Sequence, residues 1–78
     1  MFNYENKPKG DLTIPERLKY YRTLRGFTRK ALARRAGIPL ATYEKYEYAQ
    51  VKEPNARHLA RVAKALNVTV DDLIGDDF

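Results

Sequence analysis

Apolar residues recur three and four positions apart in a series of short segments between Ile14 and Ile74. This spacing places them on one face of an α-helix, whereas no segment alternates apolar and polar residues over the length of a strand. The pattern predicts five short helices, at about residues 15–25, 28–36, 39–48, 55–66 and 69–74. Because the connections are brief, we expect an all-α fold, a compact five-helix bundle.

Residues with short polar side chains mark the starts of several of these helices. Thr28, Asn55 and Thr69 can each accept a hydrogen bond from a backbone N–H that the first helical turn leaves free. Gly26 and Gly37 mark the ends of the first two helices, because glycine adopts the left-handed backbone conformation without steric strain. These local signals agree with the boundaries that the apolar spacing predicts.

The segment between Thr28 and Tyr48 has a distinctive layout. Two helices of about two turns each flank a turn centred on Gly37, which is the arrangement of a helix-turn-helix unit. Tyr43 and Tyr46 lie three residues apart on the inner face of the helix at about residues 39–48, which favours core packing over base stacking. In the helix at about residues 28–36, the residues that we expect to face the core are Ala31, Leu32 and Ala36.

The residue inventory argues against catalysis and against metal binding. The 78-residue chain has no cysteine, which excludes disulfides, thiolate metal sites and cysteine nucleophiles. Its one histidine, His58, has no second histidine at ligand spacing, and no nucleophile–base pair stands out. We therefore expect no enzyme activity, no cofactor and no metal site.

Charge is distributed unevenly along the chain, whose formal net charge is +5. Residues 1–13 are neutral. Residues 14–64 carry thirteen basic residues and four glutamates, a net of +9, whereas residues 65–78 carry four aspartates and no base, a net of −4. The basic middle favours an anionic partner, such as nucleic acid or an anionic membrane surface. The acidic end should face away from a polyanion, because like charges repel.

The same patterns divide the chain into three parts. Residues 1–13 lack hydrophobic periodicity and contain Pro8 and Gly10, so we expect a flexible N-terminal arm. Residues 14–74 form the helical domain, and residues 75–78 form an acidic C-terminal tail. No apolar run approaches the length of a membrane span or a signal peptide, which predicts a cytoplasmic protein without membrane contact.

Groups of residues across the helical domain match one family in order and spacing. They are Arg22, Gly26-Phe27-Thr28, Leu32-Ala33, Ala36-Gly37-Ile38, Thr42-Tyr43, Tyr46-Glu47, Pro54 and the run from Leu59 to Ile74. On these residues the chain resembles the Cro/CI-repressor (XRE-type) helix-turn-helix family. The resemblance implies a lambda-repressor-like fold and binding to double-stranded DNA.

The resemblance also implies an ion pair and exposes three departures. Arg22 and Glu47 match positions that, in the family, join the first helix to the end of the recognition helix. The family commonly has Gln, then Ser or Thr, then Gly where this chain has Arg29, Pro39 and Ala49. Pro39 has no side-chain acceptor, so a customary backbone-phosphate contact is lost. The turn at Ala49 is expected to differ from that of the family.

By the same resemblance, residues 40–48 are the recognition helix, whose N-terminal end points toward base edges in the major groove. Leu40, Ala41 and Lys45 carry over as base-contacting residues, with Glu44 beside them. Leu40 and Ala41 can contact thymine methyl groups, and Lys45 can donate to guanine O6 or N7. The alternatives are helix packing for Leu40 and Ala41, and a solvated helix face for Lys45.

A second set of residues is expected to contact phosphates. Arg29 and Lys30 begin the second helix, where their charges oppose the helix dipole unless a phosphate binds there. The alternative for these cations is a solubilising role, which is our expectation for Arg34 and Arg35. The expected phosphate-contacting residues are Arg29, Lys30, Thr42, Lys52 and Asn55.

Taken together, these features predict a sequence-specific DNA-binding transcriptional regulator, a repressor or controller protein, that acts as a homodimer on a near-palindromic operator. The alternative is a protein-interaction module, antitoxin-like or partner-docking, that keeps the fold and docks a protein on Pro39, Leu40 and Ala41. The excess of positive charge in residues 14–64 favours DNA. The residues available for the dimer contact, several of which must also serve the core, are Val68, Val70, Leu73, Ile74 and Phe78.

Overall fold

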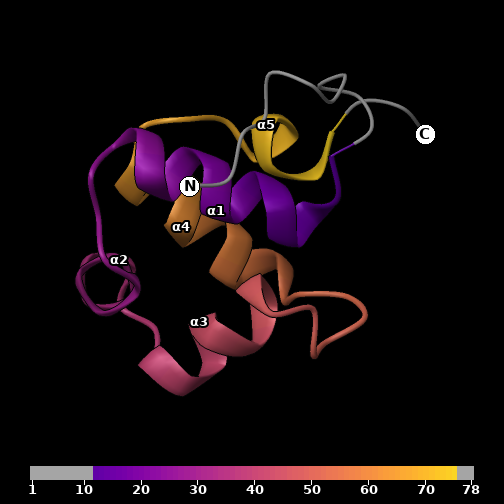
Figure 1. Ribbon diagram of the computed structural model, residues 1–78, viewed down its shortest axis with the longest axis horizontal. Helices are drawn as coiled ribbons and strands as arrows, with labels where there is room; N and C mark the ends of the chain where they lie inside the picture. Colours follow the sequence, from indigo (N-terminus) through magenta and orange to yellow (C-terminus); the bar gives the residue numbers. More distant parts are fainter. Residues whose placement is uncertain (1–11, 76–78) are drawn as a thin grey trace.

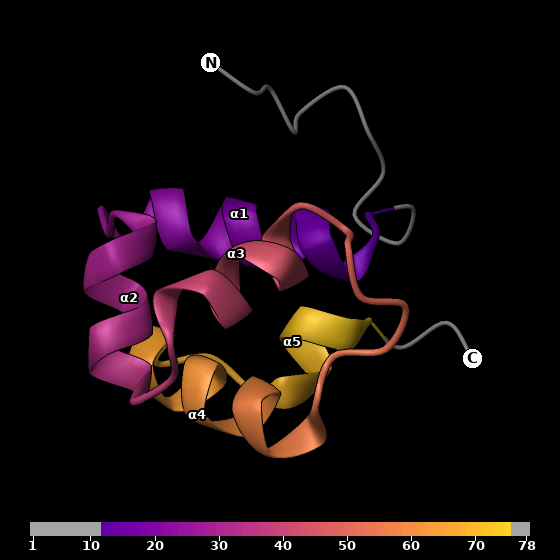
Figure 2. The same cartoon turned by 90° about the horizontal axis from the view of Figure 1, so that it is seen from below.

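The computed structural model describes residues 12–75, which form five helices and no strand (Figure 1, Figure 2). The helices are α1 (Ile14–Leu24), α2 (Arg29–Ala36), α3 (Leu40–Glu47), α4 (Ala56–Leu66) and α5 (Val70–Ile74). The predicted all-α, five-helix architecture is confirmed, and each predicted boundary lies within one residue of the observed one. The predicted N-terminal arm and acidic tail lie outside the described residues, apart from Leu12, Thr13 and Gly75.

Thr13 and Thr69 cap α1 and α5 with the same arrangement, a capping box. The backbone N–H of Glu16 donates to Thr13 Oγ1 at 3.3 Å, and that of Thr13 donates to Glu16 Oε1 at 3.0 Å. Thr69 and Asp72 exchange the equivalent pair of hydrogen bonds, each 3.0 Å long. The reciprocal bonds satisfy donors that a helix start leaves free. Because Thr13 is the cap, α1 begins at Ile14, one residue before its predicted start.

Thr28 and Asn55 cap α2 and α4, as predicted. Thr28 Oγ1 accepts a hydrogen bond from the backbone N–H of Ala31 at 3.0 Å. Asn55 Oδ1 accepts from the backbone N–H groups of Arg57, at 2.8 Å, and His58, at 3.2 Å. Each cap contributes about 1 kcal/mol to helix stability.

Left-handed backbone conformations end the helices. Gly26 and Gly37 have φ angles of +78° and +73°, as their predicted roles require. Asn67 ends α4 with a φ of +58°, and Ala49 follows α3 with a φ of +60°. Alanine in this conformation brings its Cβ close to the backbone, which costs roughly 1–2 kcal/mol. The turn after α3 is therefore strained where a glycine would relieve it.

One apolar core joins all five helices. α2 packs against α3 and α4, α1 packs against α3 and α5, and α4 also packs against α5. Tyr43 is fully buried and Tyr46 nearly so, which confirms that both belong to the core. The buried apolar cluster consists of Leu18, Tyr21, Leu32, Ala33, Ala36, Ile38, Tyr43, Tyr46, Leu59, Val62, Ala63, Leu66 and Leu73.

The expectation that Ala31 faces the core is wrong. Ala31 is exposed, and the buried positions of α2 are Leu32, Ala33 and Ala36. Ala33 and Ala36 follow Leu32 by one and four residues, which places the three on one face of the helix. Ala31 lies about 100° from Leu32 around the helix axis, on the side opposite to Ala33 and Ala36, and is therefore outside this face. The outer face of α2 therefore has a small residue among its cations.

Two arginines, one in α1 and one directly after it, attach α1 to other parts of the chain. Arg17, only 4% exposed, donates from Nε to the Leu12 carbonyl at 3.0 Å and from Nη1 to the Asp72 carbonyl at 3.3 Å. Arg25 Nε donates to the carbonyl of Leu66 at 3.0 Å, where the last carbonyls of α4 lack helical partners. The spacing of apolar residues predicts neither contact.

Candidate nucleic-acid interface

The helix-turn-helix unit consists of α2, the turn at residues 37–39 and α3. α3 lies at the lower edge of the molecule in Figure 1, and its buried side chains Tyr43 and Tyr46 face the rest of the fold. Pro39 occupies the N-cap position of α3 and makes no side-chain cap hydrogen bond. The first backbone N–H groups of α3 therefore have no cap from this side chain, as its sequence position implied.

The residues predicted to contact bases lie on the outer side of α3. Ala41 and Lys45 are exposed, Leu40 is 36% exposed, and Glu44 is half-buried. Leu40 and Ala41 occupy the first turn, so that a ligand approaching this end of α3 meets two apolar side chains. Lys45 lies one turn further along the same helix.

The residues predicted to contact phosphates differ in their surroundings. Lys30 and Lys52 are exposed, and Thr42 is half-buried. Asn55 is exposed, but its Oδ1 atom is engaged in capping α4, so that its amide NH₂ is the group left for an external ligand. Arg29 is 33% exposed at its side chain and forms an ion pair with Glu47.

Glu47, at the end of α3, is the centre of a buried polar network. Arg22 donates to it twice, from Nε to Oε2 at 2.9 Å and from Nη2 to Oε1 at 2.8 Å. Arg29 Nε donates to Oε1 at 3.0 Å, and the hydroxyl of Tyr43 donates to Oε2 at 2.5 Å. The Glu47 side chain is only 1% exposed. We call these four residues the Glu47 network.

The charges in the Glu47 network support one another. Burial alone would raise the pKa of the Glu47 carboxyl, but hydrogen bonds from Arg22 and Tyr43 and the charges of both arginines outweigh it and lower that pKa. The hydrogen bond to Glu47 raises the pKa of Arg22 although burial of the guanidinium opposes this shift. Burial and the same carboxylate raise the pKa of Tyr43, so its hydroxyl remains a donor. At neutral pH, Glu47 and Arg22 are therefore charged and paired, and Tyr43 is a neutral hydrogen-bond donor.

The network fixes α3 in relation to α1 and α2. Arg22 comes from α1 and Arg29 from the first position of α2, and Arg22 Nη1 also donates to the Phe27 carbonyl at 2.8 Å. The ion pair between Arg22 and Glu47 is the one that the resemblance implied. The participation of Tyr43 and Arg29 was missed, although Tyr43 precedes Glu47 by one helical turn and could have been found from that spacing.

Arg29 has a second contact beside its ion pair. Its guanidinium carbon lies 4.9 Å from the ring centroid of Tyr48, which is 50% exposed. A cation at the first position of a helix is disfavoured by the helix dipole. The Glu47 carboxylate and the Tyr48 ring offset that effect, and they hold Arg29 between α2 and the end of α3.

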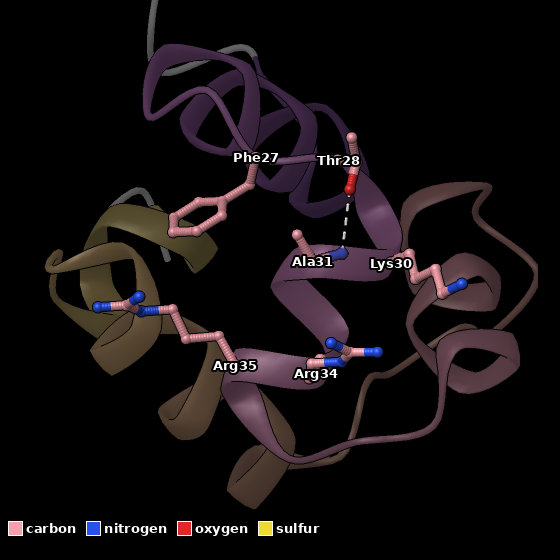
Figure 3. Close-up of a pocket in the computed structure, with 6 residues that line it drawn as sticks. All are labelled: Phe27, Thr28, Lys30, Ala31, Arg34 and Arg35. Carbon is pink, nitrogen blue, oxygen red and sulfur yellow. Dashed lines mark hydrogen bonds between the residues drawn. The ribbon is translucent and has the colours of Figure 1, made fainter.

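The outer face of α2 carries an open hollow, shown in Figure 3. Arg34 and Arg35 are exposed, as expected, and the guanidinium of Arg35 lies 5.6 Å from the ring centroid of Phe27. Figure 3 shows Phe27 and Arg35 on one side of Ala31 and Lys30 on the other. We call this surface the α2 hollow. Its lining residues are Phe27, Thr28, Lys30, Ala31, Arg34 and Arg35.

One residue predicted to supply the dimer contact is placed elsewhere. Leu73 is fully buried in the core of the protomer, so it has no surface to offer to a second copy, and this expectation is wrong. Val70 is 36% exposed, and Val68 and Ile74 are half-buried against the core. Phe78 lies outside the described residues.

His58 takes part in a contact that joins two helices of the fold. Its Nδ1 atom lies 2.5 Å from the hydroxyl oxygen of Tyr46, which links α4 to α3. Within residues 12–75, no three His, Asp or Glu side chains gather as a metal site would require. No helix in the same part of the chain combines the length and the apolar character needed to cross a bilayer.

Comparisons with known proteins agree with this geometry. A family model described as helix-turn-helix matches residues 18–73. The N-terminal DNA-binding domain of SinR from Bacillus subtilis is similar over 82% of this chain and 93% of its own, with 28% identity and a TM-score of 0.78. A crystal structure of SinR in complex with DNA is 30% identical over 78% of this chain and 97% of its own, with a TM-score of 0.75.

The P22 c2 repressor, in a crystal structure with a synthetic operator, is 26% identical over 85% of this chain and 98% of its own, with a TM-score of 0.75. A search of curated proteins finds no match. Of these three solved structures, the first is a DNA-binding domain, the second is a regulator in complex with DNA, and the third is a repressor in complex with an operator.

Proposed function

The chain belongs to the helix-turn-helix family, of the XRE type, and we propose that it is a sequence-specific transcriptional regulator that binds double-stranded DNA as a homodimer. The observation that carries the proposal is the contrast between the two sides of α3. Its inner side is held by the Glu47 network and the core, whereas Leu40, Ala41 and Lys45 face outward. A rigid helix with a free outer side is what insertion into the major groove requires.

In this proposal, Lys45 supplies most of the polar contact with bases. It donates to guanine O6 or N7, and a good contact of this kind discriminates against the wrong base by about 1–3 kcal/mol. Leu40 and Ala41 contact thymine methyl groups, and Glu44 lies beside them. This mixture of one cation and two apolar side chains favours a half-site that contains both guanine and thymine.

The contacts with the DNA backbone come from around the recognition helix. Lys30, Thr42 and Lys52 offer donors to phosphates, and Asn55 offers its amide NH₂. Arg29 uses Nε for Glu47, and its two Nη groups are available to a phosphate near the N-terminus of α2. Such contacts set the position of the protein on the duplex and carry no sequence information themselves.

The dimer contact is proposed to lie along α5 and the residues just before it. Val68, Val70 and Ile74 supply partly exposed apolar surface there. A two-fold pair would place two recognition helices about 34 Å apart on a near-palindromic operator. We further propose that the protein is a repressor or controller that acts in the cytoplasm.

Fluorescence anisotropy with a labelled duplex of random sequence, measured over a series of salt concentrations, tests the proposal. We expect binding at low salt and a steep loss of affinity as salt rises, because each phosphate contact releases counterions. Failure to bind even at low salt would overturn DNA binding. It would instead favour the alternative in which Pro39, Leu40 and Ala41 dock a protein.

A further inference from the structure

We propose that the α2 hollow is a docking surface for an acidic peptide segment of a partner protein, one with an apolar side chain among its carboxylates. This inference concerns the outer face of α2 and does not rest on the proposed DNA binding. It is drawn from the charge, the shape and the placement of the hollow.

The charge of the hollow is unbalanced. Lys30, Arg34 and Arg35 line it, all three are exposed, and none of the carboxylates in residues 12–75 lines it. Lys30 and Arg34 are four residues apart, at which spacing like charges destabilise a helix slightly. By contrast, Arg22 of α1 and Arg29 at the start of α2 are paired with Glu47. Carboxylates from a partner would therefore relieve a repulsion between cations that residues 12–75 leave uncompensated.

The shape of the hollow selects a peptide over a bare anion. The Phe27 ring and the small Ala31 side chain provide an apolar floor, and Arg35 is held over that ring. The hollow has a volume of about 590 Å³, which accommodates a large side chain together with its neighbours. A phosphate of the DNA backbone would contact the cations but leave the ring and the floor uncovered.

The placement of the hollow separates it from the recognition helix. Ala31, Arg34 and Arg35 lie on the side of α2 that faces away from Leu32 and the core. The outward residues of α3 belong to a different helix, at the lower edge in Figure 1, while α2 is seen end-on at its left. Of its cations, only Lys30 is also among the proposed phosphate contacts, so a duplex bound at α3 should compete for Lys30 alone and leave Arg34 and Arg35 to hold the peptide.

The test uses the full chain and a fluorescent peptide of sequence Glu-Glu-Leu-Glu-Glu-Leu-Glu-Glu. In Ala31→Glu, a carboxylate enters the hollow at the third helical position, where it can form a capping box with Thr28, so the variant should fold at least as well as wild type. We expect it to weaken peptide binding by about tenfold through charge repulsion and lost apolar contact. The matched control is Ala60→Glu, which makes the same charge change at an exposed position of α4 and should alter affinity by less than about twofold.

Two further measurements complete the test. Replacing both leucines of the peptide by glutamate should weaken binding about threefold despite the added charge, because the apolar floor is then unused. Saturating duplex should not displace the peptide. Absence of peptide binding at low salt, equal losses in Ala31→Glu and Ala60→Glu, or displacement by duplex would each overturn the proposal. Self-association that Ala31→Glu abolishes would assign the surface to a second copy and also overturn it.

Discussion

The cations in and beside the helix-turn-helix unit occur in two contrasting settings. Arg22 and Arg29 share the buried carboxylate of Glu47, at distances of 2.8 and 3.0 Å. Arg34 and Arg35, one or two turns further along α2, are exposed in a hollow whose described lining has no carboxylate. The difference teaches that positive charge in this chain serves two purposes. Paired cations set the position of the recognition helix, and exposed cations are available to anionic partners.

The largest expected effect comes from disrupting the Glu47 network. Replacing Glu47 by alanine leaves Arg22 buried without its partner, which should lower the free energy of unfolding by about 3–5 kcal/mol, as urea denaturation would measure. The double variant Arg22→Met, Glu47→Leu removes both charges and should recover much of that loss. A loss of less than about 1 kcal/mol in Glu47→Ala, typical of a surface pair, would contradict the role given to the network.

The next effect concerns the outer side of α3. Lys45→Ala should remove discrimination of about 1–3 kcal/mol at the base pair that Lys45 contacts, with little change elsewhere in the site. Binding to a panel of single-base variants of the preferred site would measure it. Lys64→Ala, on the exposed side of α4, is the control and should leave the preference unchanged. An identical preference in Lys45→Ala and wild type would show that Lys45 does not contact bases.

Arg29 combines the two settings, because its Nε is paired with the buried Glu47 carboxylate while its two Nη groups are available to a phosphate. Arg29→Ala should weaken binding to all duplexes alike, by about 1 kcal/mol, and lower the salt dependence by roughly one counterion. Arg29→Lys keeps the charge, so it should keep the salt dependence while losing the planar contacts with Glu47 and Tyr48. An unchanged salt dependence in Arg29→Ala would leave Arg29 with a purely positioning role.

The smallest effect concerns the strained turn that follows the network. Ala49→Gly relieves the left-handed alanine but raises the entropy of the unfolded chain, so we expect a net stabilisation of about 0.5–1 kcal/mol. Ala60→Gly, inside α4, is the matched control and should destabilise the protein by about 1 kcal/mol. Thermal unfolding of both variants would measure the difference. Destabilisation by Ala49→Gly would show that this turn is not strained.

The helices were predictable because their signals are local. Thr28, Asn55 and Thr69 act within three residues of themselves, and the glycines act through their own φ angles. The errors arose where exposure depends on the rest of the fold. The spacing within α2 left Ala31 as a candidate for the core, and the short α5 did not show which of its apolar residues would be fully buried, as Leu73 is.

The candidate site was predictable in part. The pairing of Arg22 with Glu47, 25 residues apart, came from the resemblance to a family and not from spacing. Arg29 departs from that family, and its ion pair with Glu47 depends on how α2 meets the end of α3. The contact of Arg17 with the Asp72 carbonyl joins residues 55 positions apart, a separation over which no local pattern acts.

The central claim is that α3, held by the Glu47 network, reads DNA as one of a two-fold pair. Selection of bound duplexes from a random-sequence library tests this claim most directly. We predict enrichment of a near-palindromic site whose half-sites are centred about one helical turn, roughly 34 Å, apart. A selected pool with no sequence in common, or with an isolated half-site alone, would contradict the claim.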